Sequence, residues 1–208
     1  MGRLGAALLT SLALLGPARV HGQGDARDDA LARQVESTLS AGVEPREASH
    51  AIVALGEPGE RALVRVFERD EAARYVRLRA LALLGAFRTE SAARYLEGLV
   101  KASQHEDDTL GALHPARSPL VLRRALDGLS ASAAQLGARL DTKAVTSCLA
   151  HPDAHVRKSA ADLLAKLDGR PEVDRALVQR LEREPSKMVR GTLGRAITDR
   201  SARRAAPR

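Results

Sequence analysis

The chain has 208 residues, of which 44% are hydrophobic, and this is enough for one domain with a continuous core. Aromatic residues make up only 2% and Trp is absent, so the core is expected to be aliphatic and rich in alanine, with helices that approach one another closely. The single cysteine excludes an internal disulfide. The formal charge of +7 does not by itself indicate nucleic-acid binding. Six of the arginines lie in the terminal stretches 1–22 and 200–208, which contain no acidic residue, so the rest of the chain is nearly neutral.

Residues 1–22 have the layout of a secretory signal peptide. Arg3 supplies a basic start, residues 4–16 carry no charge, and Pro17 breaks the segment before a site of small residues. The apolar run is shorter than the roughly 20 residues that a membrane-spanning helix needs, and it has no polar stripe that would suit a buried amphipathic helix. We therefore expect cleavage near Gly22–Gln23, a periplasmic or secreted protein, and no membrane span after cleavage.

The predicted mature chain begins with residues 23–43, a loose segment followed by a capping helix. Residues 24–29 are polar and predicted to be loose, and residues 30–41 are predicted to be helical, with Gly42 placed to end the helix. The apolar stripe of this helix consists of Leu31, Val35 and Leu39.

A second helix is predicted to open at Pro45 and to stop at Gly56, because proline suits the first turn of a helix. Residues 57–59 then read as a turn, residues 60–68 as a helix, and residues 72–84 as its antiparallel partner. The apolar positions of these segments are Ala48, Ile52, Leu55, Leu63, Val66, Phe67, Val76, Ala80, Leu83 and Leu84.

The next predicted unit is interrupted. Residues 88–90 read as a turn and cap before a helix with Ala92, Leu96, Leu99 and Val100 inward, and the polar stretch 103–118 reads as an insertion. Ser118-Pro119 is a strong helix start. From there an apolar stripe runs to Leu140, as one long helix or as two helices broken near Asp127-Gly128. The pattern favours a break.

Regular helix pairs return after Leu140. Asp141 and Asp153 are predicted to cap two helices, and proline turns separate two more, which end near Ile197. The inward positions are Val145, Cys148, Leu149, Val156, Ala160, Leu163, Leu164, Val173, Leu177, Leu181, Val189, Leu193 and Ile197. Residues 200–208 have no apolar face and are predicted to be a disordered basic tail.

One helical phrase recurs along the chain: an aliphatic residue and Arg, then small residues, closing on Leu-Gly or a near equivalent. It occurs at 76–85, 156–165 and 189–197, with a cruder copy at 48–56. The phrase resembles HEAT repeats, most closely the short bacterial variety first noticed in phycobilin lyases. The resemblance implies an all-α, right-handed α-α superhelix, an armadillo-like solenoid of about four helix pairs over residues 44–199.

The recurring arginines are candidates for partner binding. Arg77, Arg157 and Arg190 occupy equivalent positions in the phrase, and stacking of repeats would align them along one edge. Arg124 is a looser analogue, and Arg79 is the fifth candidate, with the 103–118 insertion as a specificity element. The alternative, which the sequence favours, is that each Arg pairs with an acid of its own turn, such as Asp70 or Asp153, and holds the repeats in register.

Other reactive side chains have simpler explanations. Residues 105–108 with His114 read as a solvated acidic loop rather than a metal site, and Pro152 places His151 outside the helix that carries His155. Cys148 reads as a small buried apolar residue. We therefore predict no catalytic residue, cofactor or metal.

The predicted function is that of an exported, non-catalytic scaffold or adaptor, monomeric by itself, that binds another protein through a concave face. Two alternatives are an accessory subunit of a cofactor or chromophore lyase, which the resemblance suggests, and a nucleic-acid-binding repeat protein.

Overall fold

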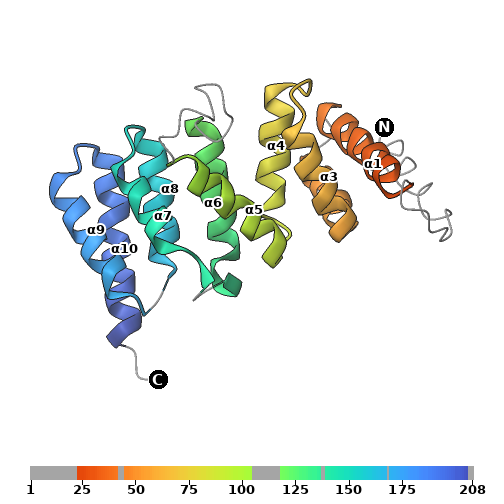
Figure 1. Ribbon diagram of the computed structural model, residues 1–208. Coiled ribbons are helices and arrows are strands. Elements are labelled where there is room, and N and C mark those ends of the chain that lie inside the picture. The colour runs from red at the N-terminus through yellow and green to blue at the C-terminus, as the bar shows by residue number, and fades with distance from the viewer. Residues whose placement is uncertain (1–22, 42–44, 105–117, 137–138, 168, 206–208) are drawn as a thin grey trace. The chain divides into compact units, whose positions relative to one another are not determined.

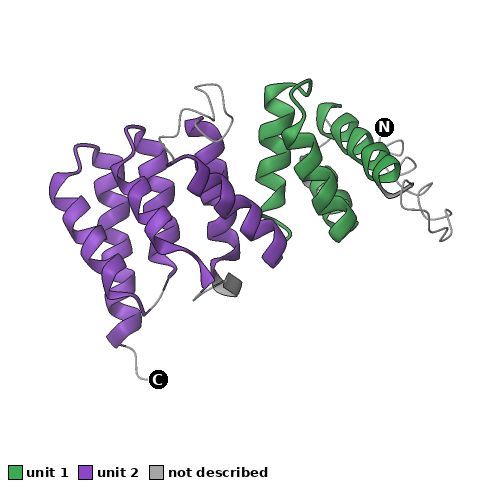
Figure 2. Ribbon diagram, viewed as in Figure 1, with its two compact units in different colours: residues 1–87 green, residues 88–208 purple. Residues whose placement is uncertain are grey.

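The computed structural model describes residues 23–41, 45–104, 118–136, 139–167 and 169–205 (Figure 1). Over these residues the protein is all-α, with no strand, as the sequence predicts. The predicted signal peptide, Gly42 and most of the predicted insertion lie outside the described residues. None of the helices in the described ranges is long and apolar enough to cross a membrane. The chain divides into two compact units, residues 1–87 and 88–208 (Figure 2).

Unit 1 contains four described helices: α1 (Gln23–Ser40), α2 (Pro45–Val53), α3 (Glu57–Glu68) and α4 (Arg74–Leu84). Helix α3 packs between α1 and α4, and α2 lies against α1 and α3. The predicted stripes of α1 and α3 are buried, which confirms these two helices. On α4 the sequence places Leu83 inward, but Leu81 is buried and Leu83 is only half-buried.

The first helix is longer than predicted, because residues 24–29 are helical and not loose. Their carboxylates face arginines that recur every fourth residue on α3. Asp28 accepts from Arg61 Nε at 3.1 Å, and Asp29 accepts from Arg65 Nη1 at 2.7 Å. A polar segment with no apolar stripe is thus fixed by ion pairs with the neighbouring helix, which a local reading of the segment cannot anticipate.

Residues 57–59 are also helical: they form the first turn of α3 rather than a separate turn. Pro58 stands within the first two positions of the helix, where the missing N–H costs no hydrogen bond. Gly56, with φ of 62°, reverses the chain just before the helix begins. Gly59 is buried, and a Cβ at this position would clash with the carbonyl oxygen of Ile52.

Unit 2 contains α5 (Glu90–Ala102), α6 (Pro119–Leu136), α7 (Thr142–Ser147) with a short 3-10 helix (Cys148–Ala150), α8 (Ala154–Ala165), α9 (Pro171–Arg183) and α10 (Lys187–Ala205). Helices α6, α8 and α10 pack against one another in that order and form one layer (Figure 1). Helix α5 packs on α6, α7 on α8, and α9 on α10, so these three form a second layer. Consecutive helix pairs of unit 2 therefore lie side by side.

The caps that the sequence predicts in unit 2 are confirmed. The Thr89 hydroxyl accepts from Ala92 N at 3.2 Å at the start of α5. Asp141 accepts from the backbone N–H groups of residues 143 and 144, and Asp153 from those of residues 155 and 156. Each cap satisfies backbone donors that the first turn of a helix leaves without a partner.

Leu99, Leu181 and Ile197, which the sequence places inward, are only half-buried. Two predictions about the extent of helices in unit 2 are also wrong. Helix α6 is continuous over Asp127-Gly128, where the sequence pattern favours a break, because Leu126 and Leu129 stay on one buried stripe across the glycine. Residues 200–205 are helical rather than disordered. Arg200 is buried and donates to Asp174 Oδ1 at 2.7 Å and to Leu164 O at 3.1 Å, so a charged residue anchors the end of α10.

Candidate protein-interaction face

Helix α8 exposes one narrow stripe to solvent. Helices α6 and α10 flank it on two sides and α7 packs behind it, so Val156, Ala160 and Leu163 are fully buried. The side chains that remain accessible follow one another at helical spacing and come from His155, Lys158, Asp162, Ala165 and Lys166. This stripe, with the adjoining exposed stripes of α6 and α10, forms a continuous surface that we call the α6–α8–α10 face.

Each of the three helices places a basic residue on this face and an aspartate four residues later. The pairs are Arg123 and Asp127 on α6, Lys158 and Asp162 on α8, and Arg195 and Asp199 on α10. The α8 pair is joined at 2.6 Å, whereas the α6 pair is 3.8 Å apart. Arg195 donates to Thr192 Oγ1 at 3.3 Å within its own helix.

The three aspartates meet in a hollow of about 400 Å³ between the helices. Its remaining lining consists of Ser130, Ala165, Lys166 and Arg203. Lys166 Nζ donates to Ser130 O at 3.0 Å, and Arg203 donates to Ala165 O. These two contacts connect the later turns of α6, α8 and α10. They place Ser130, Lys166 and Arg203 at about the same height along the three helix axes.

Helices α8 and α10 run in the same direction, since Glu184, just before α10, binds Arg157 in the first turn of α8, and Arg200 binds Leu164 O near the end of α8. The three basic residues consequently form one row across the face, and the three aspartates form a second row one helical turn further on. Two exposed apolar side chains, Leu120 and Met188, lie beyond the basic row towards the helix N-termini.

The predicted arginine candidates separate into two groups. Arg77 donates to Phe67 O at 2.7 Å and to Asp70 at 3.3 Å, with its guanidinium carbon 5.6 Å from the centre of the Phe67 ring. Arg190 donates to the carbonyl oxygens of Glu184 and Pro185, both at 2.8 Å. Arg77 therefore holds the end of α3 and pairs with an acid of its own turn, as the structural alternative expects, whereas Arg190 holds the turn before α10 through carbonyl groups.

Arg157 is the clearest correction to the proposed partner-binding set. It is 6% exposed, donates to the carbonyl oxygens of His151 and Pro152, and forms two hydrogen bonds to the Glu184 carboxylate, at 2.9 and 2.7 Å. Its acid partner belongs to the next helix pair and not to its own turn at Asp153. Four of the five N–H donors of this guanidinium are used inside the protein and the side chain is buried, so Arg157 is not accessible to another protein.

Glu184 is the acceptor at the centre of this cluster. Its side chain is fully buried and also accepts from Arg180 Nε at 2.8 Å and from Ser186 N at 2.9 Å. Burial by itself raises the pKa of the carboxyl, but the hydrogen bonds from Arg157, the Ser186 N–H and Arg180 outweigh it and lower the pKa to about 2. The carboxylate therefore stays ionised and joins α8, α9 and α10.

The two remaining candidates differ in exposure. Arg79 is half-buried in unit 1 and donates to Leu39 O at 2.6 Å, which ties α4 to the end of α1. Arg124 is exposed on α6, three residues before Asp127, and so lies on the α6–α8–α10 face. Arg124 is the candidate from the sequence that the structure leaves accessible on this face.

Comparisons with known protein families, with curated protein sequences and with solved structures find no match to this chain. The HEAT resemblance thus stands on the repeated phrase alone.

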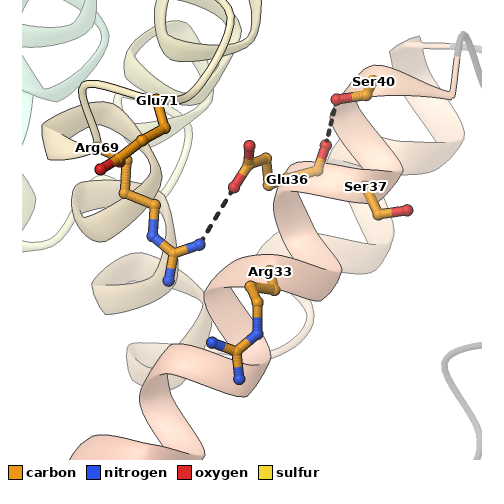
Figure 3. A pocket seen from close by; sticks show the side chains of 6 residues that line it. All are labelled: Arg33, Glu36, Ser37, Ser40, Arg69 and Glu71. Carbon is orange, nitrogen blue, oxygen red and sulfur yellow. Dashed lines mark hydrogen bonds and ion pairs between the residues drawn. The ribbon is translucent and has the colours of Figure 1, made fainter.

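A second hollow lies in unit 1, along the last turns of α1 (Figure 3). Its lining carries two guanidiniums and two carboxylates, from Arg33, Arg69, Glu36 and Glu71, with Ser37 and Ser40. Figure 3 shows Arg69 and Glu36 reaching towards each other, at 3.3 Å. Because this contact continues the ion pairs between α1 and α3, the hollow is explained by how the two helices are held together.

The reactive side chains of unit 2 are where the sequence predicts them. Cys148 is buried, and burial raises the pKa of its thiol to about 11, with an opposing contribution from Gln104, so the sulfur is protonated at neutral pH. His151 Nδ1 accepts from Asp153 N at 3.0 Å, outside α8, while His155 is exposed on the first turn of α8. The loop containing His105 and His114 lies outside the described residues.

The two charged rows are not among the sites that the sequence predicts, because the repeated phrase points to arginines at its own equivalent positions. A signal was present: a basic residue followed by aspartate four residues later occurs once in each of α6, α8 and α10. Nothing in the sequence distinguishes these pairs from other charged pairs at this spacing, since only packing shows that they share a face.

Proposed function

We propose that the protein is an exported, non-catalytic helical-repeat scaffold that binds another protein through the α6–α8–α10 face. The fold we propose is the right-handed HEAT-like solenoid of about four helix pairs. Two features support it: consecutive pairs of unit 2 lie side by side, and Arg77, Arg157 and Arg190 each donate to carbonyl groups at the end of the preceding helix or in the turn that follows it.

The observation that carries the binding proposal is the accessible stripe of α8. A helix covered by neighbours on its other sides presents to solvent a line of mainly charged and polar groups, and α6 and α10 extend that line into a surface of both signs. Mixed charges at protein interfaces fix the orientation of a partner and exclude partners with the wrong pattern. Two exposed apolar side chains at the edge of this face, Leu120 and Met188, add apolar surface that would be buried on binding.

Site-specific photo-crosslinking in the producing cells tests this proposal. A photoreactive residue at Ala131, which is exposed on α6, is expected to yield a discrete covalent adduct with another protein. The same group at Ser147 or Gln179, which are exposed on α7 and α9 in the other layer, serves as the control. Adducts from the control positions in the absence of any from Ala131 would contradict the proposal.

Export is tested separately. The chain recovered from producing cells is expected to begin at Gln23, because the signal peptide is removed on export. A chain that keeps Met1 and fractionates with the cytoplasm would contradict this part of the proposal.

A further inference from the structure

Opposite charges four residues apart stabilise a helix in either order, and the α6–α8–α10 face carries the less favourable of the two orders. In each helix the basic residue precedes the aspartate, whereas a helix is stabilised by acids towards its N-terminus and bases towards its C-terminus. The same disfavoured order occurs three times in helices that pack side by side. Helix stability therefore does not favour this order over the reverse order in any of the three helices.

The internal contacts of these side chains do not account for the pattern either. Asp127 lies 3.8 Å from Arg123, which is too long for a hydrogen bond, and Lys158 and Asp162 are about two-fifths exposed. Exposed ion pairs of this kind contribute little to the stability of a fold.

The spacing of the rows matches a helix. Neighbouring packed helices lie about 8–10 Å apart, so each row offers a charge at about that interval. A helix that crosses α6, α8 and α10 presents every seventh side chain at intervals of about 10.5 Å. Residues four positions further along the crossing helix form a second line on the same side, displaced by about 6 Å along its axis, and long Lys or Arg side chains span this displacement to the second row. A single strand presents one line of side chains to a surface and cannot serve two rows.

From this geometry we infer that the partner element is a helix that lies across α6, α8 and α10, with carboxylates along one edge and Lys or Arg along the other. The carboxylates pair with Arg123, Lys158 and Arg195, and the basic side chains pair with Asp127, Asp162 and Asp199. This inference rests on the proposed function and specifies the partner's chemistry.

Two synthetic helical peptides of equal composition test the inference. The row peptide carries Glu at three positions seven residues apart and Lys four residues after each Glu. The alternating peptide has Glu, Lys, Glu in the first line and Lys, Glu, Lys in the second. At low ionic strength the full-length protein is expected to bind the row peptide at least about tenfold more tightly than the alternating peptide, and the preference is expected to shrink in high salt.

A charge exchange in α8 makes the test specific. The double variant Lys158→Asp with Asp162→Lys turns each row into an alternating one and puts the α8 charges in the order that the helix favours. It is expected to fold normally and to prefer the alternating peptide. The matched control, Glu90→Arg with Arg94→Glu, exchanges an ion pair on α5 in the other layer and is expected to keep the wild-type preference.

Circular dichroism and thermal unfolding establish that both variants fold. Equal binding of the two peptides by the wild-type protein, or an unchanged preference in the α8 variant, would overturn the inference. If either of these peptide results is found but Ala131 still gives a crosslinked adduct, the proposed function stands. The partner would then not be a helix with the two lines of charge described above. Failure of the crosslinking as well would remove both.

Discussion

At the scale of single residues, the arginines of the repeated phrase act inside the molecule. Each donates to carbonyl groups at the end of the preceding helix or in the turn that follows it, and Arg157 also binds an acid in the following helix pair. A backbone carbonyl group can accept a hydrogen bond from a guanidinium whatever the side chains of the turn are. The Arg-to-carbonyl contact therefore recurs even where the acidic residues of the turns differ. The phrase is thus explained by the fastening of turns, and the partner-binding interpretation keeps only Arg124 and the charged rows.

Replacing Glu184 with Ala is expected to lower the free energy of unfolding by about 3–5 kcal/mol, because it leaves the buried Arg157 guanidinium without its counter-charge. Denaturant unfolding measures the change. The matched control is Glu57→Ala, which removes an exposed carboxylate from Arg61 and is expected to cost less than about 0.5 kcal/mol. An equal decrease in the free energy of unfolding in the two variants would show that the buried cluster contributes no more to stability than an exposed ion pair.

The same carboxylate predicts how stability depends on pH. Its pKa in the folded protein, about 2, lies below the ordinary value of 4.5, so its contribution is complete above pH 4.5 and is lost as the pH falls from 4.5 to 2. The pKa values of Asp141, Asp153 and Asp174 are lowered in the same direction. Thermal unfolding of wild type and Glu184→Gln between pH 6 and pH 2 is expected to give a shallower decline for the variant, and parallel curves would contradict the assignment.

At the scale of elements, helix boundaries follow two kinds of information. Caps and apolar stripes are local, so the starts of α5, α7 and α8 and the buried sides of α1 and α3 follow from the sequence. The first turns of α1 and the end of α10 depend on ion pairs with distant residues, Arg61 and Arg65 in one case and Asp174 in the other. Those extensions have no apolar period, and a local pattern treats them as loose.

Truncation tests the assignment of the end of α10. A chain that ends at Ala205 is expected to be as stable as the full chain. A chain that ends at Asp199 loses the buried Arg200 and its contacts to Asp174, Leu164 and Arg170, and is expected to be less stable by at least about 2 kcal/mol. Urea unfolding of the two truncated chains decides the matter, since equal stability would mean that residues 200–205 contribute nothing.

Two glycines within helices are expected to respond in opposite directions to Ala. Gly98 lies exposed in α5 with nothing near a new Cβ, so Gly98→Ala is expected to stabilise the protein by about 0.5–1 kcal/mol. At Gly59 a Cβ would clash with Ile52 O and come within 2.9 Å of Leu55 Cβ, so Gly59→Ala is expected to destabilise it. Thermal unfolding measures both, and a stable Gly59→Ala protein would contradict the close approach of α2 to α3.

At the scale of the whole molecule, the sequence predicts the fold class better than the site. An aliphatic, alanine-rich composition and a recurring helical phrase are enough to predict stacked helices, because close packing needs small side chains at regular intervals. The candidate face depends on which charged stripes remain uncovered after packing, and charged stripes are common on helices. The repeated phrase therefore points to arginines that the fold uses internally, and gives no signal for Lys158, Asp162 and their neighbours.

Both proposals require that the α6–α8–α10 face binds another protein. Hydrogen–deuterium exchange of the full-length wild-type protein, with and without the partner captured by crosslinking at Ala131, measures this binding without any substitution in the chain. Bound partner is expected to slow exchange in residues 154–166 and in the facing parts of α6 and α10, and to leave α7 and α9 unchanged. Slowed exchange confined to α7 and α9, with residues 154–166 unaffected, would contradict it.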